Sequence, residues 1–66
     1  MARFVALKMK RLKSGNIEAT IDVFDHRFIV WRQRITKRDL KTCVHHAQIV
    51  AWKMHIQEPV LIRGPA

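Results

Sequence analysis

The chain has 66 residues, 48% of them hydrophobic, and 13 lysines and arginines against five acidic residues give it a formal net charge of +8. A chain of this length buries only about 60% of its unfolded surface, which predicts a single small basic domain, residues 1–66, without the walls of a deep enzymatic pocket. The hydrophobic fraction, with two glycines and two prolines, excludes a largely disordered chain. The charge predicts attraction to a polyanion.

Three segments in the first part of the chain alternate polar and apolar residues, as half-buried strands do. They span about 3–12, 17–24 and 28–35, and the turn sequences "KSGN" and "DHR" separate them. The third segment, "FIVWRQRI", is also rich in β-branched and aromatic residues, which favour strands. Three consecutive antiparallel strands are therefore expected.

Loop lengths determine which residues face each other across the two hairpins. A three-residue loop at 14–16 places Met9 opposite Ile21, whereas a two-residue loop would set lysines opposite apolar residues. In the second hairpin, a three-residue loop at 25–27 places Ile21 opposite Trp31. A two-residue turn is nearly as favourable there, so that register stays open.

A helix is predicted over about 37–56, ending before Pro59. The sequence "TKRD" predicts a capping box in which Thr36 is the N-cap and Asp39 follows three residues later. Apolar residues then recur at helical spacing and form one stripe. These residues are Leu40, Cys43, Val44, Ala47, Val50, Ala51 and Met54.

The last apolar run, "VLIR" at 60–63, is expected to return to the sheet as a short edge strand, followed by a tail at 64–66. The predicted fold is α+β, with a small three- to four-stranded antiparallel-type sheet in the order β-β-β-α-β. One helix packs on one face of that sheet.

A second apolar group lies opposite the main stripe of the helix and comprises Ile49, Trp52 and Ile56. A domain with one helix has no further element to cover these side chains. We therefore expect them to form an interface, and a homodimer is the commonest use of such a patch.

Cys43, His45, His46 and His55 lie within thirteen residues. Zinc sites need four converging ligands, usually in paired motifs, and no second half-site follows. Cys43 falls on the apolar stripe, so we expect a small buried core residue there. No nucleophile–histidine–acid order or glycine-rich phosphate loop occurs in the chain, and we expect no metal, no cofactor and no enzymatic activity.

The longest apolar run, "FIVW", is far shorter than the roughly 18 residues that cross a bilayer. A single cysteine provides no disulfide framework and fits a reducing compartment. We expect a cytoplasmic protein without membrane contact, associated with the nucleoid if it binds DNA.

Basic residues gather in the first strand and in the segment "VWRQRITKRDLK", and they predict a nucleic-acid-binding surface. Those of the strands share the sheet face turned away from the helix with Phe24 and Phe28, although Glu18 and Asp22 on that face would weaken its field. Those at the start of the helix surround its free N–H groups, a ready anion site. The predicted binding residues are Lys8, Lys10, Arg32, Arg34, Lys37, Arg38 and Lys41.

The sequence "ATIDVFDHRFIVWRQRIT" followed by "HHAQIVAW" resembles the DNA-binding domains of integrase arm-binding and plant ethylene-response-factor type. In that family the sheet enters the major groove, so the resemblance implies that Lys10, Arg32 and Arg34 contact bases. The chain departs from the family because it lacks a glycine-rich first strand and adds the "VLIR" segment.

The expected function is that of a small, basic, non-enzymatic regulatory protein that binds nucleic acid, with DNA favoured over RNA. The alternative is a small modulator or inhibitor, such as a phage or other mobile element encodes. It would dock on an acidic partner protein through the Trp52 face.

Overall fold

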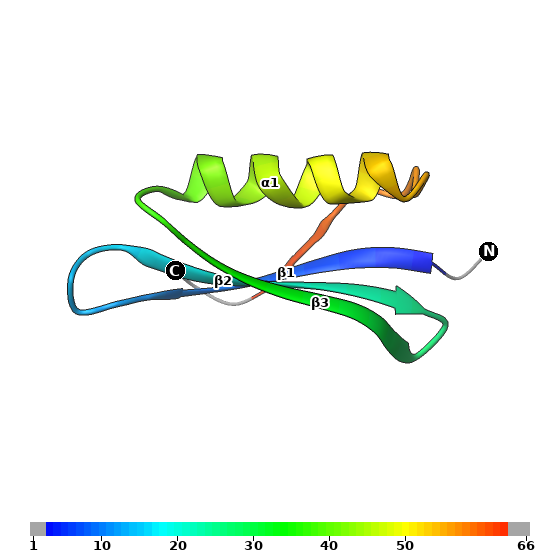
Figure 1. Cartoon of the computed structure of the whole chain (residues 1–66), viewed down its shortest axis with the longest axis horizontal. Helices are drawn as coiled ribbons and strands as arrows, with labels where there is room; N and C mark the ends of the chain where they lie inside the picture. Colours follow the sequence, from blue (N-terminus) through cyan, green and yellow to red (C-terminus); the bar gives the residue numbers. More distant parts are fainter. Residues whose placement is uncertain (1–2, 64–66) are drawn as a thin grey trace.

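The computed structural model describes residues 3–63. A four-stranded sheet in the order β3-β2-β1-β4 carries one helix, α1, on one face, and no other described element covers the opposite face (Figure 1). The elements are β1 (Arg3–Arg11), β2 (Ile17–Asp25), β3 (Phe28–Lys37), α1 (Leu40–Lys53) and β4 (Leu61–Arg63). This confirms the predicted α+β fold and element order. The sheet is mixed and not wholly antiparallel, because β4 runs parallel to β1.

The first hairpin turns through a three-residue loop that lies one residue earlier than predicted. The N–H of Gly15 donates to the carbonyl of Leu12 at 3.0 Å, and Gly15 has a φ of 93°, which glycine adopts without steric cost. The loop is therefore 13–15, and Met9 faces Ala19, two residues before its predicted partner. A shift of two keeps every side chain on its predicted face, so the alternation alone cannot distinguish the two registers.

The second hairpin closes with a two-residue turn that begins at His26, whose φ is 59°, and the predicted three-residue loop is wrong. Val23 faces Trp31, but the residue after Val23 faces Ile29. Val30 is therefore an extra residue in β3, a β-bulge. The short turn and the bulge together set the register and leave Trp31 on the face that α1 covers.

The junction between β3 and α1 corrects the predicted start of the helix. Lys37 pairs with Ile17, so β3 extends through Thr36, which cannot be the N-cap. Asp39 is the N-cap instead, and its Oδ1 accepts a hydrogen bond from the backbone N–H of Thr42 at 2.8 Å. Threonine and aspartate are both good N-caps. The pairing of Thr36 and Lys37 with β2 extends the strand, so the helix begins later, with Asp39 as its N-cap.

The helix ends at Lys53, three residues before the predicted end. His55 has a φ of 58°, and its N–H donates to the carbonyl of Trp52 at 3.1 Å. The N–H of Ile56 donates to the carbonyl of Ala51 at 2.9 Å. This is a Schellman motif with histidine at the position that glycine usually takes. It folds the chain back, so Ile56 packs against the helix.

The core fills the space between α1 and the covered face of the sheet. Every second residue of β2 is buried, and the helix contributes most of its predicted stripe, although Leu40 is exposed. Each buried branched side chain contributes about 1.5–3 kcal/mol relative to an exposed one. The core residues are Val5, Leu7, Met9, Ile17, Ala19, Ile21, Val23, Cys43, Ala47, Val50, Ala51 and Ile56.

The last strand, β4, begins one residue later than predicted and pairs its three residues with β1. The predicted tail at 64–66 lies outside the described residues. The single helix of residues 3–63, α1, lacks the length and apolar character of a membrane-crossing segment.

Candidate nucleic-acid interface

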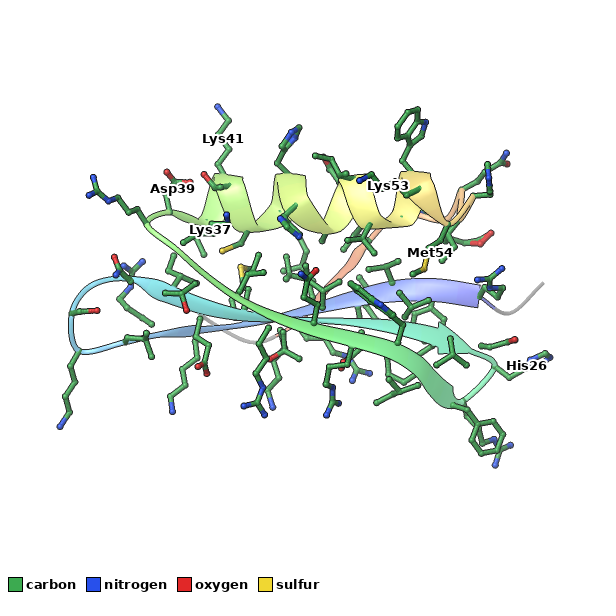
Figure 2. The ribbon with its side chains drawn as sticks, in the orientation of Figure 1. His26, Lys37, Asp39, Lys41, Lys53 and Met54 are labelled. Carbon is green, nitrogen blue, oxygen red and sulfur yellow. The ribbon has the colours of Figure 1, made fainter. Side chains whose placement is uncertain are left out.

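The uncovered face of the sheet, which we name the open face, carries its side chains in rows across the strands. In the central row Lys8 and Arg34 flank Thr20 of β2. The parallel pairing of β4 adds Arg63 beside Lys8. Figure 2 shows side chains with nitrogen tips projecting from the side of the sheet opposite α1. The open face therefore presents cations from three strands around a small polar centre.

The rows on either side of this central row differ in charge. On one side Lys10 neighbours Glu18, which pairs with Thr36 of β3. On the other side Asp22 lies beside Arg32. The open face thus brings together four of the residues predicted to bind nucleic acid, and both carboxylates that were expected to weaken its field.

Only part of this positive charge is neutralised within the protein. The guanidinium of Arg32 donates to Asp22 at 2.6 Å and 3.3 Å, and this hydrogen bond, with the carboxylate charge, raises the pKa of Arg32 above its ordinary value. The other contact between a basic and an acidic side chain found in residues 3–63 is the hydrogen bond between His26 Nδ1 and Asp25 Oδ1 at 2.9 Å. The cations of the open face other than Arg32 have no ion-pair partner within that range.

The end of the open face next to the second hairpin is apolar. The rings of Phe4 and Phe24 stack with centroids 4.7 Å apart and planes 4° apart. Ile29 lies opposite Phe24, so the bulge gives Ile29 the place expected for Phe28. The open face therefore grades from aromatic at one end to cationic at its centre.

The three remaining predicted cations lie elsewhere. Lys37 belongs to the covered face, since it pairs with Ile17, whereas Arg38 and Lys41 are exposed. Figure 2 shows Lys41 at the start of α1, pointing away from the sheet. The segment that appeared as one cluster in the sequence is thus divided between two sides of the molecule, because successive residues of a strand point to opposite faces.

The start of α1 is already capped by its own carboxylate. Asp39 Oδ1 accepts from the backbone N–H of Thr42 at 2.8 Å and from its hydroxyl at 2.7 Å. These hydrogen bonds, with a smaller contribution from Lys41, hold the pKa of Asp39 below its ordinary value. The carboxylate of Asp39 lies at the positive end of the helix, so the protein's own negative charge already occupies the place expected for a bound anion.

The predicted docking face is smaller than expected. Trp52 is 77% exposed and Ile49 is 38% exposed, but Ile56 is only 8% exposed and belongs to the core. The correction follows from the turn at His55, which redirects the chain after the helix. Ile49 lies on the side of α1 that faces β3, where it lines a groove with Trp31.

Cys43 is a buried core residue, as predicted, and is not in a disulfide. Burial, and to a lesser extent Asp39, raises the pKa of its thiol, which keeps it in the unreactive protonated form. The side chain of His46 contacts Gln33 at 3.3 Å, and His45 is exposed. Among the described side chains no group of histidine, cysteine and acidic residues is arranged to hold a metal ion.

Two features of this surface were not predicted. Arg63 joins the central row because β4 runs parallel to β1, a pairing that no local pattern indicates. The second feature is the groove between β3 and α1, whose lining combines side chains from these two elements, far apart in the sequence. One indication of the first feature was present in the sequence: Arg63 is the last residue of "VLIR", a segment that was predicted to join the sheet.

No protein-family model, no characterised protein and no solved structure matches this chain.

Proposed function

We propose that this protein binds nucleic acid through the open face, with duplex DNA as the preferred form. The observation that carries the proposal is the row Arg63, Lys8, Thr20 and Arg34 on a face without a covering element. Its three cations have no ion-pair partner in the described part of the chain. Unpaired cations on an exposed surface neutralise phosphates and release counterions, which is a large source of affinity for DNA.

The spacing of three of the strands, β3, β2 and β1, supports a duplex. Neighbouring strands lie about 4.8 Å apart, so β1 and β3 are roughly 10 Å apart, close to the roughly 12 Å width of the major groove of B-form DNA. Cations on β1 and β3 then lie near the two phosphate rims, and β4 lies beyond the rim on the β1 side, where Arg63 meets the phosphate backbone. Thr20 and Glu18 on the central strand face the base edges, where a carboxylate accepts from the amino group of cytosine. The major groove of A-form RNA is too narrow for such entry.

A salt titration tests the proposal. If the four open-face cations without an ion-pair partner, Lys8, Lys10, Arg34 and Arg63, each engage one phosphate, the logarithm of the affinity for a fluorescein-labelled duplex falls against the logarithm of the salt concentration with a slope of about −3.6. Replacing Lys8, Lys10 and Arg34 together by alanine makes the slope shallower by roughly three. Arg34→Ala alone makes it shallower by about one. Fluorescence anisotropy at several salt concentrations measures each slope, and absence of salt-dependent binding contradicts the proposal.

Lys53→Ala is the matched control, because it removes one exposed cation from α1 and leaves the open face intact. Its slope equals that of the unchanged protein. Arg38→Ala with Lys41→Ala forms a separate arm that tests the cations at the start of α1. A loss in this arm as large as in the open-face variants contradicts the assignment to the open face.

Trp52→Ala separates this function from the alternative of docking on an acidic protein. Trp52 is highly exposed on α1, away from the open face. The substitution therefore leaves affinity for duplex DNA unchanged. A protein whose cellular activity requires Trp52 but not Arg34 acts by docking instead.

A further inference from the structure

The strand β3 forms a free edge of the sheet. In the strand order of residues 3–63 it has β2 as a neighbour on one side and no strand on the other. It is ten residues long, so a row of backbone N–H and C=O groups along that side is without ladder partners. Edges of this length are templates for the addition of another strand.

An apolar groove runs beside this edge, between β3 and α1. It has a volume of about 390 Å³. Met54 points from the end of α1 toward the sheet and helps to form its wall (Figure 2). The lining residues are Trp31, Gln33, His46, Ile49, Val50, Lys53 and Met54. A groove between a helix and an edge strand accepts side chains of a strand added to that edge.

The charges along the edge are positive. Arg32 and Arg34 belong to the open side of β3, and Lys53 lines the groove on the other side. Of the nearby acids, Asp22 is engaged by Arg32 and Asp39 caps the helix. An incoming strand with carboxylates on its open side would therefore meet Arg34 and would share Arg32 with Asp22.

The same charges disfavour a second copy of this chain as the partner. If β3 paired antiparallel with β3 of another copy in the register centred on Gln33, Arg32 of each copy would lie opposite Arg34 of the other on one face. Like charges directly opposite destabilise a strand pair.

We propose that β3 takes up, as an added strand, an extended segment of another protein in which acidic and apolar residues alternate. Successive side chains of a strand point to opposite faces, so this alternation directs the apolar side chains toward the groove and the carboxylates toward Arg32 and Arg34. Backbone hydrogen bonds to the free edge supply affinity, and the groove and the arginines supply specificity. The backbone edge and the groove lie outside the open face, but Arg32 and Arg34 belong to both sites. Substitutions at Lys8 and Lys10, which lie on the open face away from this edge, therefore distinguish this inference from DNA binding.

A synthetic peptide with the sequence Glu-Val-Glu-Leu-Glu-Val-Glu, blocked at both ends and labelled with fluorescein, is the probe. Anisotropy shows saturable binding, and hydrogen exchange shows slower exchange of the β3 amides in the complex. A peptide with lysine in place of glutamate does not bind. A peptide N-methylated at the central leucine and at the glutamate that follows it keeps every side chain and the charge, but lacks an N–H donor on each side of the strand. It therefore loses a ladder bond in either orientation and binds at least about tenfold more weakly. Equal binding of the acidic and N-methylated peptides would overturn the proposal, because it would indicate attraction by charge alone.

Ile49→Glu places a carboxylate in the groove and weakens binding of the acidic peptide by roughly tenfold or more. Gln48→Glu adds the same charge on a flank of α1 that does not line the groove, and it leaves binding nearly unchanged. Lys8→Ala with Lys10→Ala keeps peptide binding intact. Equal effects of the two glutamate substitutions overturn the proposal. So does a concentration-dependent dimer whose β3 amides are protected without peptide, because it would identify a second copy as the occupant.

Discussion

The two faces of the sheet are built from alternate residues of the same strands, yet they differ in almost every physical respect. In β2 the covered face presents Ile17, Ala19, Ile21 and Val23, all fully or almost fully buried, whereas the open face presents Glu18, Thr20, Asp22 and Phe24, all half-buried. The covered face supplies the burial that holds a 66-residue chain together. The open face contributes little to the core, so its residues are free to be selected for binding.

The largest effect that tests the difference between the two faces comes from separate substitutions of two adjacent residues of β1. Leu7 is fully buried, and Leu7→Ala destabilises the fold by about 2–5 kcal/mol. A chain of this size has a total stability of roughly 3–10 kcal/mol, so the substitution removes a large fraction of it and unfolds the protein if the total lies at the low end of that range. Lys8→Ala changes stability by less than about 0.5 kcal/mol while weakening DNA binding. Urea unfolding followed by circular dichroism measures both, and similar losses in the two variants contradict the division between faces.

The next effect concerns the ion pair on the open face. Asp22→Asn frees Arg32 for one more phosphate, so affinity for duplex DNA rises roughly fivefold at about 0.15 M salt. The slope of the salt titration becomes steeper by about one. Asp25→Asn is the control, because Asp25 pairs with His26 at the hairpin turn and not with an open-face cation. Unchanged or weaker binding by Asp22→Asn indicates that the carboxylate itself contacts the DNA.

The faces were more predictable than the pairing within them. The period-two alternation assigned Lys8, Lys10, Arg32 and Arg34 to one face, and the structure has them there. Alternation is unchanged by a slip of two residues, which is why the predicted partner of Met9 was wrong. The bulge at Val30 and the parallel pairing of β4 depend on contacts between segments far apart in the chain, and no local pattern reports them.

The helix shows the same division between what is local and what is not. Its apolar stripe follows from spacing along the sequence, and its buried residues fall on that stripe. The start of the helix does not follow from the local sequence. Thr36 and Asp39 are both suitable N-caps, and the pairing of Thr36 with β2 leaves Asp39 as the N-cap. The error at the C-terminal end removed Ile56 from the predicted interface, and the division of the basic segment between β3 and α1 separated Lys37 from Arg34.

A smaller effect is expected at the end of α1, where His55 occupies a left-handed conformation with a φ of 58°. A side chain with a Cβ pays a steric penalty there that glycine avoids, so His55→Gly raises stability by about 1 kcal/mol. The melting temperature rises by about 4–8 °C for a domain of this size. His55→Ala removes the imidazole but keeps the Cβ, and it produces no such gain. Equal stabilisation by glycine and alanine would indicate that the imidazole, and not the backbone, is unfavourable.

The smallest effect concerns the start of α1 and separates its carboxylate from the cations around it. The pKa of Asp39 is lowered in the folded protein, so its contribution to stability is complete above its ordinary pKa of 3.8 and is lost as the pH falls through the lowered value. Asp39→Asn keeps a good N-cap that does not titrate, so this variant loses less stability than the unchanged protein between pH 5 and pH 2. Urea unfolding at several pH values measures the difference between the two proteins. Parallel loss of stability would show that the carboxylate of Asp39 has no role in offsetting the charge of Lys41 and its neighbours, and that the cations at the start of α1 are tolerated without it.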